Sequence, residues 1–256
     1  MEEHRFGHEN TVALPLRENW TVSVPIEAVQ AFEFFAVHDY TLIKEMDNFI
    51  AATYGKKCFL DVGAYFGVFS VAFLRYSPED SQVHSFEPSP TAYPILKCIR
   101  DSVAHDPGRW TIVPMAVAAQ TGSIELVRDP NTSHLCRIQA FLEYPKHVES
   151  FSSTSLDDYV SRLSLRPDLL KIDVEGCEAE VFAGASKTLS EYRPDLCLEL
   201  HNDLLRRCGH APELLLKQLM QLDYQVRRVD QPMKIARVAD CVEKPVVRLF
   251  LNADKR

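Results

Sequence analysis

Two short acidic segments of the chain combine residue types that could do chemistry. One runs Phe59-Leu60-Asp61-Val62-Gly63-Ala64-Tyr65-Phe66-Gly67, and the other runs Lys171-Ile172-Asp173-Val174-Glu175-Gly176-Cys177-Glu178. Each pattern is typical of a β-strand that ends in a carboxylate and a glycine and then opens a helix. Open α/β sheets build ligand crevices at the carboxyl ends of their strands. The two segments therefore predict a crevice that binds a nucleoside cofactor.

The first segment differs from the usual dinucleotide-binding turn. Gly63 and Gly67 flank the predicted strand-to-helix turn, where the backbone can approach a ligand closely and helix N–H groups point into the crevice. A dinucleotide fold would normally offer G-x-G-x-x-G, but this chain places Asp61 in front of the glycines. A carboxylate there suits a cationic ligand. Glu87, after the second predicted strand, is placed to accept both ribose hydroxyls.

The second segment is predicted to end a strand whose charged residues share one side. Lys171 and Asp173 are two residues apart, and Glu199 and His201 repeat that spacing at the end of a later apolar run. These four groups could converge around a substrate hydroxyl. We interpret Glu178 as a carboxylate that favours a helix N-terminus rather than as a reacting group.

The elements that must position these residues follow from hydrophobic periodicity. From Cys58 onward, short apolar runs alternate with helical patterns, which predicts β-α units and a largely parallel sheet. The expected strands lie near 58–62, 82–86, 110–114, 168–174, 194–200, 224–229 and 245–251, the last two forming a closing antiparallel hairpin. The expected helices lie near 66–76, 90–104, 177–190 and 211–222.

Two regions lie outside this alternation. Residues 1–54 are expected to form an N-terminal extension, either a cap on the core or a dimer contact, with residues 55–256 as the main domain. Residues 127–155 show no clear period but contain aromatics and histidines, so they are the predicted substrate lid.

Composition excludes several classes of protein. The net charge is −8, from 28 Lys+Arg against 36 Asp+Glu, so the long-range field would repel a nucleic-acid backbone. The seven cysteines are scattered and never spaced C-x-x-C, which fits a reducing compartment. No segment has the unbroken apolar length of a membrane span, and no signal-peptide pattern opens the chain. We expect a cytoplasmic protein without nucleic-acid or membrane partners.

Taken together, these residues resemble the FkbM-type methyltransferases, which depend on S-adenosylmethionine and belong to the seven-stranded Rossmann-like class. The resemblance runs from about Cys58 to Leu200. It rests on Leu60-Asp61-Val62-Gly63-Ala64-x-x-Gly67, Phe86-Glu87-Pro88, Ala116 with Thr121-Gly122, Ser155-Leu156-Asp157-Asp158, Lys171-Ile172-Asp173-Val174-Glu175-Gly176-x-Glu178, Gly184-Ala185 and Glu199-x-His201. It implies an open, mostly parallel α/β sheet of seven strands, with helices on both faces and a C-terminal antiparallel hairpin.

The resemblance also implies where S-adenosylmethionine would lie. Asp61 and Gly63 would be near its methionine part, Glu87 on the ribose, and the turn at Met115 and Ala116 beside the adenine. The full set of implied cofactor-binding residues is Asp61, Gly63, Ala64, Tyr65, Gly67, Glu87, Pro88, Met115, Ala116 and Asp173. The family usually has Asn where this chain has Tyr65.

Methyl transfer to a hydroxyl requires in-line alignment and a base that takes the proton. Asp173 and His201 are the first candidates for that base, because Asp173 has the best position and His201 a pKa matched to neutral pH. Lys171 would orient Asp173 or stabilise alkoxide charge, and Glu199 completes the predicted catalytic set. A divalent metal held by Asp173, Glu199, His201 and Asn202 is an alternative that we do not favour.

The sequence thus predicts O-methylation of a small molecule, a sugar or a secondary metabolite. A homodimer is one option for the assembly of the enzyme. One alternative is a nicotinamide-dependent oxidoreductase, against which the missing third glycine and Asp61 both argue. The other is an inactive Rossmann-like scaffold. A scaffold has no need to keep Asp61, Gly63, Glu87, Lys171 and Asp173 together.

Overall fold

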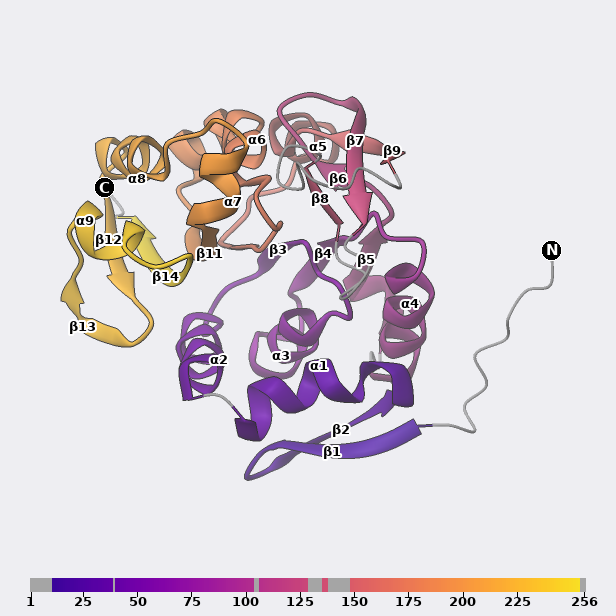
Figure 1. Cartoon of the computed structure of the whole chain (residues 1–256). Coiled ribbons are helices and arrows are strands. Elements are labelled where there is room, and N and C mark those ends of the chain that lie inside the picture. Colours follow the sequence, from indigo (N-terminus) through magenta and orange to yellow (C-terminus); the bar gives the residue numbers. More distant parts are fainter. Residues whose placement is uncertain (1–10, 39, 104–105, 129–134, 138–147, 254–256) are drawn as a thin grey trace.

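The centre of the protein is an eight-stranded sheet with the order β13-β12-β14-β11-β10-β3-β4-β5 (Figure 1). The computed structural model describes all residues except 1–10, 39, 104–105, 129–134, 138–147 and 254–256. The strands of this sheet are β3 (Cys58–Val62), β4 (Gln82–Phe86), β5 (Trp110–Val113), β10 (Leu169–Ile172), β11 (Asp195–His201), β12 (Tyr224–Arg228), β13 (Gln231–Ile235) and β14 (Val246–Ala253).

The strand directions place the two acidic segments side by side. β3 pairs in parallel with both β4 and β10, and β10 pairs in parallel with β11. β14 runs antiparallel between β11 and β12. The chain leaves β3 toward β4 on one side and returns to β10 on the other, so the carboxyl ends of β3 and β10 flank the point where the strand order reverses. Ligands bind at such a point in open α/β sheets.

All seven strands predicted from the sequence are present, and the antiparallel pairing of β12 with β14 is confirmed. The eighth strand, β13, was not predicted. It pairs with the outer edge of β12, and all five of its residues are exposed. It therefore has no buried face to impose an apolar alternation on its sequence.

Helices cover both faces of the sheet. Successive side chains of a strand point to opposite faces, and in the central strands both sets are apolar. On one face, Phe59 and Leu169 pack with α3 (Val68–Tyr76) and α4 (Ala92–Val103). On the other, Leu60 and Leu170 pack with the helices from the second half of the chain. Those are α5 (Leu156–Leu163), α6 (Glu178–Ala183), α7 (Asn202–Arg207), α8 (Pro212–Gln221) and α9 (Val238–Val242). No helix in the described ranges is long and apolar enough to cross a membrane.

The helix predicted over 177–190 is shorter than expected. α6 ends at Ala183, and a separate π-helical turn follows over Thr188–Tyr192. The interruption coincides with Gly184, where a Cβ atom would lie 2.1 Å from the carbonyl oxygen of Ala118. A close backbone approach thus requires glycine at the point where the helix stops.

The N-terminal segment packs on the same face of the sheet as α3 and α4, as Figure 1 shows in indigo. It contains the hairpin of β1 (Thr11–Arg17) and β2 (Trp20–Pro25), a 3-10 turn (Ile26–Ala28), α1 (Val29–Glu33), a π-helical turn (Phe34–His38) and α2 (Tyr40–Ala52). Met46 and Phe49 of α2 are buried, and the Phe49 ring contacts Phe59 and Phe69 at centroid distances of 5.1 and 4.9 Å. α2 therefore shares its core with the central sheet.

A second sheet has the order β6-β9-β7-β8 and follows β5 in the chain. Its strands are β6 (Ala116–Val117), β7 (Gly122–Arg128), β8 (Leu135–Arg137) and β9 (Val148–Thr154). The prediction that 127–155 is irregular is wrong over 127–128 and 135–137, where β7 pairs antiparallel with β8, and over 148–154, where β9 pairs antiparallel with β7. Serines at 150, 152 and 153 gave β9 the composition of a loop. Residues 129–134 and 138–147 of the predicted lid lie outside the described residues.

Candidate active site at the carboxyl ends of the central strands

The turn after β3 is built on two glycines in the left-handed region. Gly63 has φ +79° and Gly67 has φ +76°. A Cβ atom on Gly63 would lie 1.8 Å from the carbonyl oxygen of Asp173, so the turns after β3 and β10 lie directly against each other. A Cβ atom on Gly67 would meet Leu96 at 2.6 Å. The two acidic segments recognised in the sequence thus meet at one place.

Glu87 braces this turn from the end of β4. Its Oε2 accepts a hydrogen bond from the backbone N–H of Tyr65 at 2.8 Å, and its Oε1 accepts one from the N–H of Ser89 at 2.7 Å. Tyr65 itself has φ +49° and stacks on the ring of Phe66 at a centroid distance of 3.8 Å. Asn tolerates the left-handed region better than most residues, so the Asn that the resemblance implies here would suit this backbone.

Other predicted cofactor residues lie around the same turn. Ala64 donates its N–H to the carbonyl oxygen of Phe86, and Pro88 directly follows Glu87. The backbone N–H groups of Glu87 and Met115 both donate to the carbonyl oxygen of Val113, at 3.1 and 2.8 Å. Ala116 begins β6 and is buried. The turn after β5 therefore lies beside the acid that ends β4.

Asp61 has a more internal position than the sequence suggested. Only 1% of the residue is exposed, and its Oδ2 accepts a hydrogen bond from Ser70 Oγ at 2.6 Å. Ser70 also bonds to Ser85, which accepts from the indole N–H of Trp110 at 2.7 Å. Burial raises the pKa of Asp61 to about 6, against the lowering effect of Ser70. The carboxylate thus anchors α3 to the strands beneath the turn.

A closed ring of six ionisable groups lies at the carboxyl ends of β10 and β11. Its successive members are Asp173, Lys171, Glu45, Arg248, Glu199 and His201. The atoms that face each other lie 3.1 Å apart for Asp173–Lys171, 3.5 Å for Lys171–Glu45, 3.0 Å for Glu45–Arg248, 2.7 Å for Arg248–Glu199, 3.9 Å for Glu199–His201 and 4.0 Å for His201–Asp173. Carboxylates alternate with nitrogen groups throughout. We call this set the six-residue ring.

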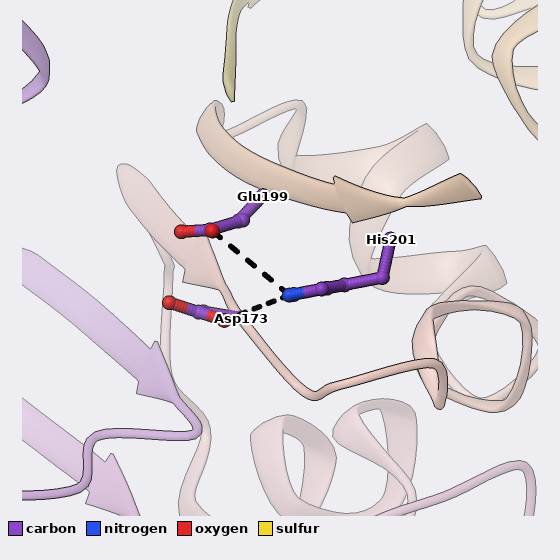
Figure 2. A group of neighbouring side chains, drawn as sticks. All are labelled: Asp173, Glu199 and His201. Atoms are coloured by element: carbon purple, nitrogen blue, oxygen red, sulfur yellow. Dashed lines mark ion pairs between the residues drawn. The ribbon is translucent and has the colours of Figure 1, made fainter. Parts of the chain in front are cut away.

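Three members of the ring surround a shared point, which Figure 2 shows with His201 between Asp173 and Glu199. The side chain of Asp173 is 31% exposed, whereas those of Glu199 and His201 are 11% and 6% exposed. Asp173 is therefore the most accessible of the three. Glu175, which has φ +48°, brings a further carboxylate oxygen to 3.4 Å from His201 Nε2.

His201 is oriented by Glu178. The imidazole Nδ1 lies 2.6 Å from Glu178 Oε1, and Glu178 is fully buried. Burial alone would lower the pKa of His201, but the hydrogen bond and charge of Glu178, with Asp173 and Glu175, raise that pKa to about 10. At neutral pH the His201 side chain is an imidazolium whose Nε2–H faces the carboxyl groups of Asp173, Glu175 and Glu199.

The acids of the ring differ in their affinity for protons. Burial disfavours the charge of Asp173, but Lys171 and His201 outweigh it and lower the pKa to about 2. Burial and the charge of Asp173 raise the pKa of Glu199 to about 8. For Lys171, burial is outweighed by Asp173 and Glu45, so its pKa lies above the ordinary value. Glu199 therefore holds a proton more strongly than Asp173 does.

A divalent metal, the alternative considered from the sequence, would bind at the same three residues. One atom each of Asp173, Glu199 and His201 can be chosen so that all lie within 4.8 Å of one another. Asn202 is held by its Nδ2, which donates to the carbonyl oxygens of Cys241 and Lys244 at 3.0 and 2.8 Å. Lys171 and Arg248 already contact the two acids.

Sequence reasoning placed Asp173, Lys171, Glu199 and His201 together, but it missed Glu45 and Arg248 and gave Glu178 only a helix-terminal role. Glu178 does begin α6 and accepts from the N–H of Gly176 at 3.4 Å, so both roles apply. A signal for Glu45 exists in its spacing: it lies four residues before Phe49, on the apolar side of α2.

The strand order β5-β4-β3-β10-β11-β14-β12, with β14 antiparallel, and an acid at the end of β4 define a Rossmann-like methyltransferase. The chain belongs to the methyltransferase FkbM domain family, whose model matches residues 61–226. This is a family of S-adenosylmethionine-dependent enzymes.

Two known proteins are similar to the chain. The 2-O-methyltransferase NoeI of Sinorhizobium fredii is 29% identical over an alignment of 153 residues, which covers 52% of this chain and 59% of NoeI. The crystal structure of methyltransferase FkbM from Methylobacillus flagellatus superposes with a TM-score of 0.51 at 16% identity, covering 88% of this chain and 59% of that one. The second likeness concerns the fold alone. The chain thus spans somewhat over half the length of each.

Proposed function

We propose that the protein transfers a methyl group from S-adenosylmethionine to a hydroxyl of a small molecule, a sugar or a secondary metabolite. The observation that carries this proposal is the contact between the Gly63 turn and Asp173. It puts the predicted cofactor crevice next to the most accessible acid of the six-residue ring. The name of NoeI, a 2-O-methyltransferase, supports oxygen as the methylated atom.

The residues around the turn fit the proposed cofactor. Glu87 accepts one backbone N–H on each carboxylate oxygen, and an ionised carboxylate offers about four acceptor sites, so ribose hydroxyls can bond to the same oxygens. Glu87 would hold the ribose, and the turn at Met115 and Ala116 would lie along the adenine. When bound, S-adenosylmethionine supplies a methyl group on a positively charged sulfur.

The chain's own residues would then handle the acceptor. Asp173 accepts the hydroxyl hydrogen bond and takes the proton as the oxygen bonds to the methyl carbon. Its pKa of about 2 makes it a weak base, but the hydroxyl becomes strongly acidic as the new bond forms. Lys171 fixes the carboxylate from 3.1 Å, and the imidazolium of His201 stabilises negative charge between Asp173 and Glu199.

The test begins with the methyl donor. Calorimetric titration with S-adenosylmethionine, S-adenosylhomocysteine and NAD should show binding of the two sulfur nucleosides, weakened in Glu87→Ala. Glu79→Ala, an exposed acid after α3, is the matched control. Binding of NAD alone would point to the oxidoreductase, and binding of none of the three to the scaffold.

The second step is turnover with methyl-labelled donor and a panel of sugars, nucleotide sugars and phenolic metabolites. On an acceptor found in this way, Asp173→Asn should lose turnover and keep donor binding. Asp203→Asn, which removes a 55% exposed carboxylate of α7, should change neither. Undiminished turnover in Asp173→Asn would remove Asp173 from the role of base.

A further inference from the structure

One member of the six-residue ring comes from the N-terminal segment, outside residues 61–226 that match the family model. Glu45 lies on α2 and is only 3% exposed. Its helix is fixed on the sheet by Met46 and Phe49, the buried residues next to it and one turn further on. Glu45 is therefore held by packing at a defined place opposite β10 and β14.

Glu45 joins two cations that each hold one of the acids proposed to face the acceptor. Its Oε1 lies 3.5 Å from Lys171 Nζ, and its Oε2 lies 3.0 Å from Arg248 Nε. Lys171 in turn contacts Asp173 at 3.1 Å, and Arg248 contacts Glu199 at 2.7 Å. Without Glu45 the ring is open, and the two halves have no charge between them.

Loss of the Glu45 charge would disturb both of its ion pairs, because the side chains of Lys171 and Arg248 are little exposed to water. Lys171 is 2% exposed and its ammonium lies 4.8 Å from the centre of the Phe69 ring, so water cannot replace a lost carboxylate partner. With Glu45 uncharged, Lys171 would move toward Asp173, and Arg248, which is 23% exposed, would move toward Glu199. Asp173 and Glu199 would then both change their orientation toward the acceptor.

We propose that Glu45 is a positioning residue for methyl transfer. By pairing with both Lys171 and Arg248, it holds these two cations in place, and they in turn fix Asp173 and Glu199 for the acceptor. This inference rests on the proposed function. It assigns the N-terminal segment a part in the active site rather than only in covering the core. Glu45 acts through the two cations and does not itself touch the reacting atoms.

The experiment compares Glu45→Gln with Asp47→Asn on the full-length protein. Asp47 is on the same helix, is 46% exposed and pairs with Arg17, so the control removes the same charge outside the ring. We expect kcat to fall by on the order of 10- to 100-fold in Glu45→Gln, with the Kd for S-adenosylmethionine within about 3-fold of wild type. Asp47→Asn should keep both values.

Two further variants separate positioning from stability. Glu45→Asp keeps the charge and should recover part of kcat, whereas Glu45→Gln combined with Arg248→Gln should lose less than the product of the two single losses. If Glu45→Gln does not fold, Glu45→Asp and Arg248→Lys carry the test through their own kcat and Kd. Wild-type kcat in folded Glu45→Gln, or in both conservative variants, would overturn the proposal.

A readout without an acceptor keeps the two proposals apart. The ring ¹⁵N resonances of His201, assigned through His201→Gln, report its environment in the free protein. Glu45→Gln should shift them and Asp47→Asn should not; unshifted resonances would overturn the positioning role. If the wild type transfers methyl to no acceptor while these resonances do shift, the proposed function fails and Glu45 still positions the ring.

Discussion

The imidazole of His201, the last residue of β11, lies 2.6 Å through its Nδ1 from Oε1 of Glu178, the first residue of α6. The pair joins a strand end to a helix start, and it commits Nδ1 so that Nε2 faces the acids of the six-residue ring. A carboxylate that fixes one imidazole nitrogen also fixes the direction of the other. Orientation of His201 is thus built into the backbone framework.

The charge of this pair predicts a pH dependence of stability. The pKa of His201 is about 10 in the folded protein against 6.5 ordinarily, so its contribution is full below pH 6.5 and is lost as pH rises toward 10. Glu178→Gln keeps an acceptor but lowers that pKa. Between pH 6.5 and 9, the free energy of unfolding measured in urea should therefore fall less for Glu178→Gln than for wild type. An equal fall with pH in both proteins would mean that Glu178 does not raise the pKa of His201.

Gly63→Ala should be strongly destabilising. The new methyl group would lie 1.8 Å from the carbonyl oxygen of Asp173, and the residue has φ +79°. Gly55→Ala is a matched control, because Gly55 has φ +71° but nothing within 4 Å of a Cβ atom. Gly55→Ala should lower the free energy of unfolding only by the strain of placing Ala in the left-handed region, about 1–2 kcal/mol. Chemical denaturation of both variants measures the difference, and equal losses would show that the two turns separate easily.

Tyr65→Asn should keep or raise stability. The backbone at 65 has φ +49°, which Asn adopts more readily than Tyr, while the contact of the Tyr65 ring with Phe66 is lost. Tyr65→Ala loses the same ring contact, but Ala does not adopt this positive φ as readily as Asn does. Thermal unfolding should place Tyr65→Asn above Tyr65→Ala. The reverse order would show that the strain at this position is negligible.

Much of this architecture was predictable because it rests on local patterns. Buried strands such as β3 and β10 are short apolar runs with a carboxylate at the end, and parallel pairing brings those ends together. The edge strand β13 and the serine-rich β9 escaped prediction, since neither shows a clear apolar alternation. Arg248 was missed for the opposite reason: it is a polar residue in a clearly alternating strand, on the side that looks solvent-facing.

Glu45 was missed for a different reason: its spacing places it on the apolar side of α2, but no sequence pattern indicates its partners. It is separated from Lys171 by more than a hundred residues, and a single acid on an amphipathic helix ordinarily faces water. Only the tertiary packing of α2 shows that it is buried between two cations. The family pattern in residues 61–226 could not include it either.

Lys171→Met should unfold at a clearly lower denaturant concentration than wild type. The substitution leaves Asp173 and the buried Glu45 without the ammonium that contacts both, and breaking buried ion pairs costs about 3–5 kcal/mol. Lys57→Met is the control: Lys57 pairs with Asp80, and both side chains are more than 60% exposed. Its unfolding midpoint should match wild type. A Lys171→Met protein as stable as the control would mean that the ring contributes nothing to folding.

Removal of metal ions with EDTA should leave methyl transfer unchanged. A divalent ion between Asp173, Glu199 and His201 would have to compete with Lys171 at 3.1 Å from Asp173 and with Arg248 at 2.7 Å from Glu199. Those two cations already supply the positive charge that an ion would bring to the carboxylates. The assay compares turnover before EDTA, after EDTA, and after Mg²⁺ or Mn²⁺ is restored. Loss of wild-type turnover with EDTA that a metal reverses, together with calorimetric binding of that metal to wild type but not to Asp173→Asn, would make the three residues ligands. Lys171 and Arg248 would then act by holding the ligands in place.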